Sequence, residues 1–137
     1  MNNLILVRHG QSKWNKEKRF TGWADIDLTK QGREEAEHAG KLIKELNIEF
    51  DAYFTSRLKR AINSLDIILK ILDKKDSVII KSSALNERHY GGLTSLNKDE
   101  TIKKYGNKQV EVWRRSFYTY RKERSIKNHK TFRANSE

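Results

Sequence analysis

The chain has 137 residues, of which 36% are hydrophobic and 34% charged, and its net charge is +11. This length fits one domain with a modest core, and the composition is that of a globular protein rather than a disordered one. The absence of cysteine excludes a disulfide framework and a thiolate metal site, so we expect a cytoplasmic protein. Only four apolar residues lie between Asn3 and Arg8, too few for a signal peptide or a membrane span, and no membrane association is expected.

The positive charge is compatible with three kinds of partner: nucleic acid, an acidic membrane surface or a small polyanionic substrate. Charge alone does not distinguish them. The basic residues are spread along the whole chain rather than gathered in one arm, which also fits a solvated, lysine-rich surface.

The first predicted element is a short buried strand at residues 4–7, where a fully apolar run is bounded by polar residues. Thr29 is placed to cap a helix over roughly 30–46, whose apolar positions recur every three to four residues. One face of this helix should therefore cover a sheet.

A second strand is predicted at residues 51–56, and Ser56 is placed to cap the helix that follows. That helix carries a wide apolar stripe from Leu58 to Leu72, and a third strand is predicted at 77–80. Alternating strands and helices indicate an α/β domain with a mainly parallel sheet.

The pattern changes after Asn86 to loops and short amphipathic pieces. Asn97 can cap a short helix that Gly106 ends. Residues 1–116 are therefore predicted to form the folded domain. Residues 117–137 show no sustained periodicity and are predicted to be a basic, poorly packed or disordered tail.

The chemistry starts where the first predicted strand ends, at Arg8, His9 and Gly10. In open α/β sheets, ligands bind at the carboxyl ends of strands. A neutral histidine fixed there can act as a nucleophile, an adjacent arginine can hold a phosphate by two parallel hydrogen bonds, and glycine lets the backbone approach the ligand. An ordinary surface histidine after a strand is the alternative.

Further polar residues can converge on the same edge of the sheet. Several arginines suit a ligand with many phosphate oxygens, so a multiply phosphorylated small molecule is the leading candidate ligand. Glu87 lies in a basic loop, where it is either a general acid and base or a salt-bridge partner. The other candidates are Asn15, Thr21, Gly22, Arg60, Arg114 and Arg115.

Longer motifs resemble one known family. The stretches RHGQSKWN, RFTGWADIDLT, FTSRLKRA, LNERHYGGLTSLNKDET and VWRRS are similar to the histidine phosphatase superfamily, and specifically to its cofactor-dependent phosphoglycerate mutase branch. The likeness runs nearly in register from residue 3 to 116. It covers the N-terminal half of such proteins only.

This resemblance implies a three-layer α/β fold with a mainly parallel sheet, truncated so that its C-terminal strands are absent. It implies that His9 is phosphorylated by 2,3-bisphosphoglycerate, that Glu87 is the general acid and base, and that no metal takes part. Homo-oligomers occur in the family. Phosphate and carboxylate groups would be bound by Arg8, Asn15, Thr21, Gly22, Arg60, Tyr90, Lys98, Arg114 and Arg115.

The chain departs from the family pattern in two places. Gln11 stands where the family has glutamate, and no histidine stands in the context of the family's second catalytic histidine, which follows a lid region. The resemblance also places a missing strand between residues 4–7 and 51–55, which would leave unpaired backbone groups on both segments. A buried unpaired group costs about 1–3 kcal/mol.

Three functions therefore stay open. The first is an enzyme of glycolysis and gluconeogenesis that interconverts 2-phosphoglycerate and 3-phosphoglycerate through a phosphohistidine. The second is an inactive truncated fragment of that enzyme. The third is a basic nucleic-acid-binding module, in which Trp14, Trp23 and Trp113 would stack on bases, although the same residues fall inside the family motifs.

Overall fold

A computed structural model describes residues 3–115, and the predicted tail at 117–137 lies outside this range. The described elements are α1 (Lys13–Lys16), α2 (Lys30–Glu45), β1 (Tyr53–Thr55), α3 (Lys59–Ile71), β2 (Ile79–Lys81), α4 (Lys98–Tyr105) and α5 (Asn107–Arg115), with short 3-10 turns at Ser83–Leu85 and Gly91–Leu93. None of the helices within residues 3–115 is long and apolar enough to cross a membrane.

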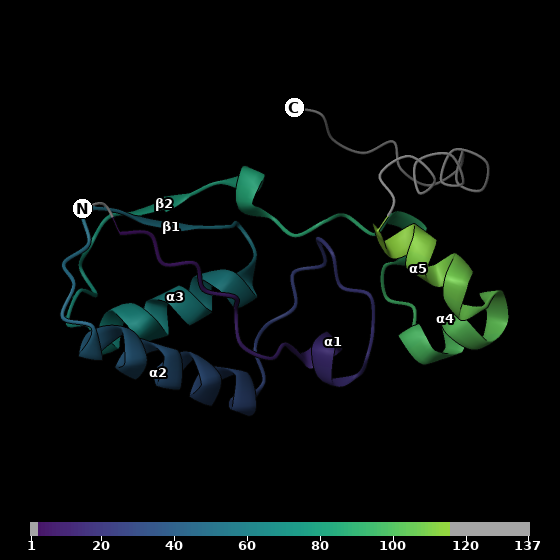
Figure 1. Ribbon diagram of the computed structural model, residues 1–137, viewed down its shortest axis with the longest axis horizontal. Coiled ribbons are helices and arrows are strands. Elements are labelled where there is room, and N and C mark those ends of the chain that lie inside the picture. Colours follow the sequence, from purple (N-terminus) through teal and green to yellow (C-terminus); the bar gives the residue numbers. More distant parts are fainter. Residues whose placement is uncertain (1–2, 116–137) are drawn as a thin grey trace.

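Helices α2 and α3 lie side by side beneath the two strands (Figure 1). As predicted, Thr29 caps α2: its hydroxyl accepts a hydrogen bond from the Gly32 amide at 3.1 Å. Gly40 allows α3 to approach closely, because a Cβ there would lie 3.0 Å from Ile71 Cδ1. The two helices form one packed layer.

The strands form a parallel pair in which Phe54 lies opposite Ile80, and α3 connects them. The predicted α/β class and parallel pairing are confirmed, although both strands are short. Thr55 is buried while its neighbour Phe54 is 58% exposed. Because successive side chains on a strand point to opposite faces, the helices cover one face of the pair and Phe54 lies on the other.

The prediction of a buried strand at residues 4–7 is wrong. This segment is not part of a sheet, and no backbone hydrogen bond joins it to another described segment. Leu4 and Leu6 are 81% and 84% exposed. The physical reason is the absence of a neighbour: within residues 3–115, no strand lies beside the segment to pair with its backbone or to cover its side chains.

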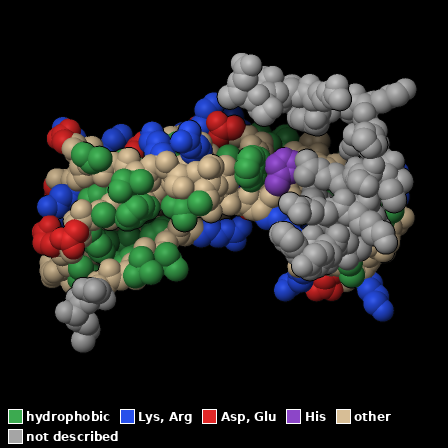
Figure 2. All heavy atoms as spheres, turned by 90° about the horizontal axis from the view of Figure 1, so that it is seen from above, with side chains coloured by type: hydrophobic (Ala, Val, Ile, Leu, Met, Phe, Trp, Pro, Cys, Tyr) green, Lys and Arg blue, Asp and Glu red, His purple; other side chains and the backbone are tan. Residues whose placement is uncertain are grey.

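A wide groove, about 1240 Å³ in volume, separates residues 3–9 from β1 and the adjoining face of α3. Figure 2 shows hydrophobic side chains gathered over the strand half of the molecule. Val78 and Ile80 are 84% and 46% exposed there. The groove lies between residues 4–7 and 51–55, where the family resemblance leads us to expect a further strand.

A hydrophobic core lies at the other end of the molecule, where the loop before Trp23 meets α4 and α5. Phe20, Leu93 and Val110 are buried together, and Tyr90, Ile102 and Trp113 pack against them. Asn97 caps α4 by accepting from the Asp99 and Glu100 amides, and Gly106 follows its last residue, as predicted. The loop between this core and the α2–α3 layer carries part of the candidate site.

Candidate active site

The site is built around Arg60, the second residue of α3, whose side chain is 1% exposed. The prediction that Ser56 caps this helix is wrong. Leu58 occupies the cap position and has no capping side chain, while the Ser56 hydroxyl accepts only from the Leu58 amide, at 3.3 Å. The first amide of the helix, on Lys59, instead donates to Asp25 Oδ1 at 2.7 Å.

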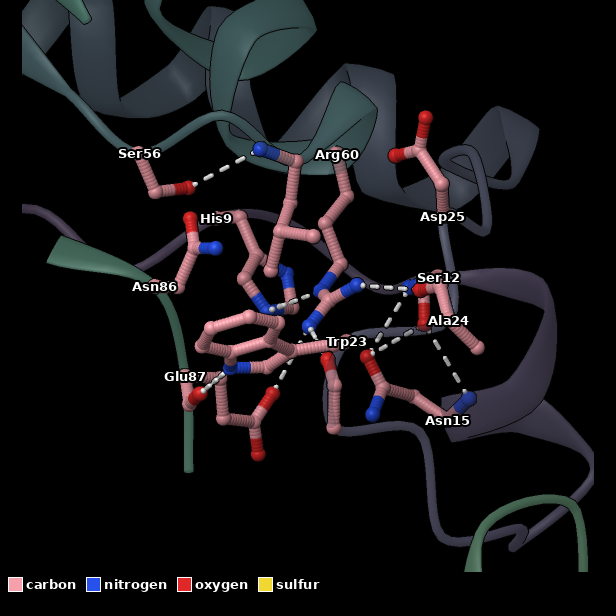
Figure 3. Close-up of polar contacts among 12 residues, drawn as sticks. His9, Ser12, Asn15, Trp23, Ala24, Asp25, Ser56, Arg60, Asn86 and Glu87 are labelled. Carbon is pink, nitrogen blue, oxygen red and sulfur yellow. Dashed lines mark hydrogen bonds and ion pairs between the residues drawn. The ribbon is translucent and has the colours of Figure 1, made fainter. Parts of the chain in front are cut away.

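The Arg60 guanidinium makes four hydrogen bonds (Figure 3). Its Nε donates to His9 Nε2 at 3.1 Å, and Nη1 donates to the Ala24 carbonyl at 3.0 Å. Its Nη2 donates to the Gly22 carbonyl at 2.8 Å and to Glu87 Oε2 at 2.9 Å. One buried arginine thus joins the three segments that carry His9, Gly22 and Glu87.

His9 is held from both sides of its ring. Nδ1 lies 2.7 Å from the Gly10 carbonyl, so the tautomer that satisfies both contacts carries its proton on Nδ1 and leaves the lone pair on Nε2. Burial lowers the pKa of His9 below 6.5, and the charges of Arg60 and Arg8 act in the same direction, against the Gly10 hydrogen bond and Glu87. His9 is therefore neutral at pH 7, as a nucleophile requires.

The backbone at Gly10 is fixed against both helices. Its amide donates to Ser64 Oγ at 3.2 Å, and the same hydroxyl donates to the Arg60 carbonyl at 2.8 Å. A Cβ on Gly10 would lie 2.0 Å from the Gly32 carbonyl oxygen. Only glycine therefore fits here against α2. The expected approach of the Gly10 backbone to a ligand stays a prediction.

Glu87 is held at two points. Its carboxylate pairs with Arg60, and its backbone carbonyl accepts from Trp23 Nε1 at 2.6 Å (Figure 3). The Glu87 side chain is 39% exposed, so it stays partly open to solvent. The expected salt bridge does form, and it is made to Arg60, in the site itself.

Positive charge extends from this centre toward α4 and α5. Burial lowers the pKa of Lys98, and the charges of Arg114 and Arg8 lower it further, against the opposing effect of Glu87. Lys98 Nζ also lies 5.8 Å from the centre of the Phe20 ring. The charges of Arg114, Glu87 and Arg8 therefore all act on the Lys98 ammonium group.

The remaining predicted residues take several positions. Thr21 is buried, and its hydroxyl has no hydrogen-bond partner within the described range. Ser12 caps α1, and Asn15, the third residue of the helix, completes the capping box with its side-chain oxygen accepting from the Ser12 amide and hydroxyl. Tyr90 packs on Phe20, with ring centres 5.3 Å apart. Arg115 is 80% exposed and pairs with Glu111, away from His9.

Sequence reasoning missed three contributors: Asp25, Trp23 and Ser64. Ser64 follows Arg60 by four residues on a helix, so helical spacing alone could have placed both on one face. Asp25 and Trp23 act across long sequence separations, for which a single sequence offers no signal. His38 lies exposed on α2, and the His89 ring meets the edge of Trp23 at 5.4 Å, while His129 lies outside the described residues.

Residues 4–134 match the histidine phosphatase superfamily (branch 1), and the chain belongs to this family. It is 57% identical over 116 residues to a protein of Hamiltonella defensa named 2,3-bisphosphoglycerate-dependent phosphoglycerate mutase, covering 85% of this chain and 47% of that one. A protein of the same name from Treponema denticola is 54% identical over 114 residues, covering 83% and 46%. The chain thus spans about half the length of these relatives.

Solved structures agree on the fold. A phosphoglycerate mutase from Bacillus anthracis matches with a TM-score of 0.68 and 26% identity, over 79% of this chain and 49% of that one. A mycobacterial glucosyl-3-phosphoglycerate phosphatase matches with a TM-score of 0.64 and 22% identity, over 75% and 49%. The expected phosphoglycerate-mutase-like α/β fold is confirmed, and the likeness again covers half of each neighbour.

Proposed function

We propose that this chain carries the phosphoryl-accepting half of a 2,3-bisphosphoglycerate-dependent phosphoglycerate mutase, an isomerase that interconverts 2-phosphoglycerate and 3-phosphoglycerate in the cytoplasm. The observation that carries the proposal is the contact between Arg60 Nε and His9 Nε2 at 3.1 Å. It places a permanent positive charge beside the lone pair that would attack phosphorus. The relatives' shared name supplies the substrate class.

In the proposed reaction, His9 Nε2 attacks the phosphorus of the bisphosphorylated donor. The new N–P bond forms as the O–P bond to the glycerate oxygen breaks, and the electron pair stays on that oxygen. Glu87, which pairs with Arg60 as a carboxylate and is partly open to solvent, takes up a proton from water and passes it to the leaving oxygen. Arg60 turns its donors from the His9 lone pair to the oxygens of the incoming phosphoryl group.

The donor set fits a ligand with several anionic groups. The charged groups of Arg8, Arg60 and Arg114 act on His9 or on Lys98, which is itself positive. Hydrogen bonds from such charged donors to phosphate are stronger than those from neutral donors. The Thr21 hydroxyl, buried and without a partner in residues 3–115, can donate to a phosphate oxygen. Roles for Asn15, Gly22, Tyr90 and Arg115 in binding belong to the same proposal.

Intact-mass measurement after incubation with 2,3-bisphosphoglycerate tests the proposal. One phosphoryl adduct is expected, lost on acidification and stable in base as a phosphohistidine is, and absent from the His9→Gln variant. A full-length relative treated in parallel is the positive control. If that relative is labelled and this chain is not, the enzymatic function is refuted.

The second candidate function is an inactive truncated fragment, and one observation favours it: the open groove beside residues 3–9. In the family, a second histidine helps to hold the transferring oxygens. Within residues 3–115, the hydrogen bonds of His9 go to Arg60 and to the adjacent Gly10 carbonyl. Loss of one such group costs on the order of a hundred- to a thousandfold in rate. Measurable adduct formation with negligible turnover would place the chain between the two candidates.

The positions of Trp23 and Trp113 do not support the nucleic-acid-binding hypothesis. Trp113 packs against the Phe20 core, and the indole N–H of Trp23 is bonded to Glu87. These contacts support the alternative interpretation, in which the aromatic residues stabilise the fold. Single-stranded DNA binding that persists at physiological salt would reverse this judgement.

A further inference from the structure

The loop at residues 22–27, here called the collar, wraps around the first turn of α3. The Gly22 and Ala24 carbonyls accept from the Arg60 guanidinium, at 2.8 and 3.0 Å. Asp25 Oδ1 accepts from the Lys59 amide at 2.7 Å, and Asp27 Oδ1 accepts from the Asn63 side chain at 2.6 Å. The collar therefore forms hydrogen bonds with both the backbone and the side chains at the start of α3.

Helix α3 has no cap of its own at this end. The cap position is Leu58, which has no side-chain acceptor, so the first amides of the helix need a partner from elsewhere. Asp25 supplies one from 34 positions earlier in the chain. Its carboxylate also faces the positive end of the helix dipole and lies 3.8 Å from Lys59 Nζ.

We propose that Asp25 is a positioning residue for the site: by holding the start of α3 at Lys59, it fixes where Arg60 presents its guanidinium to His9. Arg60 follows Lys59 directly, so any shift of the helix start moves the base of the arginine side chain. The Gly22 and Ala24 carbonyls then fix the plane of the guanidinium, so that the Arg60 Nε points at His9 (Figure 3).

Asp25 is distinct in this respect from Asp27. Asp27 also bonds the Leu28 amide and pairs with Arg33, so it ties the collar to α2 as well as to α3. The hydrogen bond and the ion pair of Asp25 within the described range both go to Lys59. Its side chain is 45% exposed, so its removal deletes these contacts without opening a cavity.

The significance of this inference rests on the proposed function, but its test does not require phosphoryl transfer. The test is the titration of His9 followed by NMR of its imidazole in the unphosphorylated chain. The ring lies beside Arg60, Arg8 and Glu87, and the nearby Arg60 charge disfavours the imidazolium. Withdrawal of the guanidinium is therefore expected to raise the pKa of His9.

Asp25→Ala is expected to raise the pKa of His9 and to speed exchange of the Arg60 Nε proton with solvent. Asp25→Asn keeps an acceptor oxygen for the Lys59 amide and is expected to restore most of the wild-type titration. The matched control is Asp73→Ala, which removes an exposed ion pair with Lys44, 2.8 Å long, at the opposite end of α3. It should leave the His9 titration unchanged.

The proposal is overturned if Asp25→Ala moves the His9 titration no further than Asp73→Ala does, or if Asp25→Asn behaves like Asp25→Ala. Should Asp25→Ala fail to fold, hydrogen exchange in the unmodified chain decides. The Lys59 amide and the Arg60 Nε proton must then exchange through one common opening, and independent exchange of the two protons refutes the coupling. A failed phosphoryl adduct with a shifted titration would refute the proposed function alone.

Discussion

Replacement of Arg60 by methionine should be among the most damaging single changes in the chain. The substitution keeps most of the buried volume but removes all four hydrogen bonds of the guanidinium. The buried Gly22 carbonyl loses its donor, and a buried acceptor left unpaired costs about 1–3 kcal/mol. The Ala24 carbonyl keeps the Ile26 amide as a donor, at 3.0 Å. Glu87 is partly exposed, so water recovers part of its loss.

The expected decrease in the free energy of unfolding is about 3–5 kcal/mol, which is a large share of the roughly 5–15 kcal/mol typical of a domain. Arg60→Lys should be intermediate, because an ammonium group keeps the charge but cannot reproduce the planar fork that meets two carbonyls and a carboxylate. Arg57→Met is the matched control: Arg57 lies three residues earlier, is exposed, and should change stability by no more than about 0.5 kcal/mol.

Urea denaturation followed by tryptophan fluorescence measures these differences, and thermal unfolding should show a Tm more than about 10 °C lower for Arg60→Met. A loss below about 1 kcal/mol, or one equal to that of Arg57→Met, would refute the view that Arg60 organises the site. The His9 titration in the same variant gives an independent check, since the pKa of His9 should rise when the guanidinium is absent.

Three further predictions follow from single contacts. The pKa of His9 is lower in the folded chain than in the unfolded chain, so just below pH 6.5 the unfolded chain binds more protons. The free energy of unfolding should therefore fall as the pH drops from 6.5 toward the folded pKa. His9→Gln should flatten this part of a plot of stability against pH. Gly10→Ala should lower the free energy of unfolding by about 1–3 kcal/mol or more, because the new Cβ would lie 2.0 Å from a backbone oxygen. Gly40→Ala should lower it less, because its Cβ would meet the end of a side chain at 3.0 Å. Equal losses in thermal unfolding would contradict this packing. Asn97→Ala should lower stability by about 1 kcal/mol through loss of the α4 cap, with no change in the His9 titration.

Local signals in the sequence predicted the helices α2, α3 and α4, but not α1 or α5. Thr29 and the periodic apolar positions after it are sufficient for α2, and Asn97 with Gly106 delimits α4, because caps and periodicity act within one or two turns. The stripe from Leu58 to Leu72 likewise predicted α3. What locates the start of α3, however, is Asp25, a long-range contact that no local pattern reveals.

The failed prediction at residues 4–7 has the same origin. An apolar run indicates that a segment can be buried in a sheet, but burial depends on neighbours that the run itself does not specify. Reasoning from strand ends and converging charges already named His9, Arg60 and Glu87, from three distant segments, and the structure joins them through one guanidinium. The family resemblance added Tyr90 and Lys98 and an expected role for each residue.

The open groove has a consequence for how the protein behaves in solution. Exposed leucine and isoleucine side chains beside unpaired main chain form a template onto which another extended polypeptide can add. The net charge of +11 opposes such contacts between identical molecules, and dissolved ions weaken that repulsion over about 10 Å at 0.1 M salt. The purified protein should therefore remain monodisperse at low ionic strength and aggregate increasingly as the ionic strength rises.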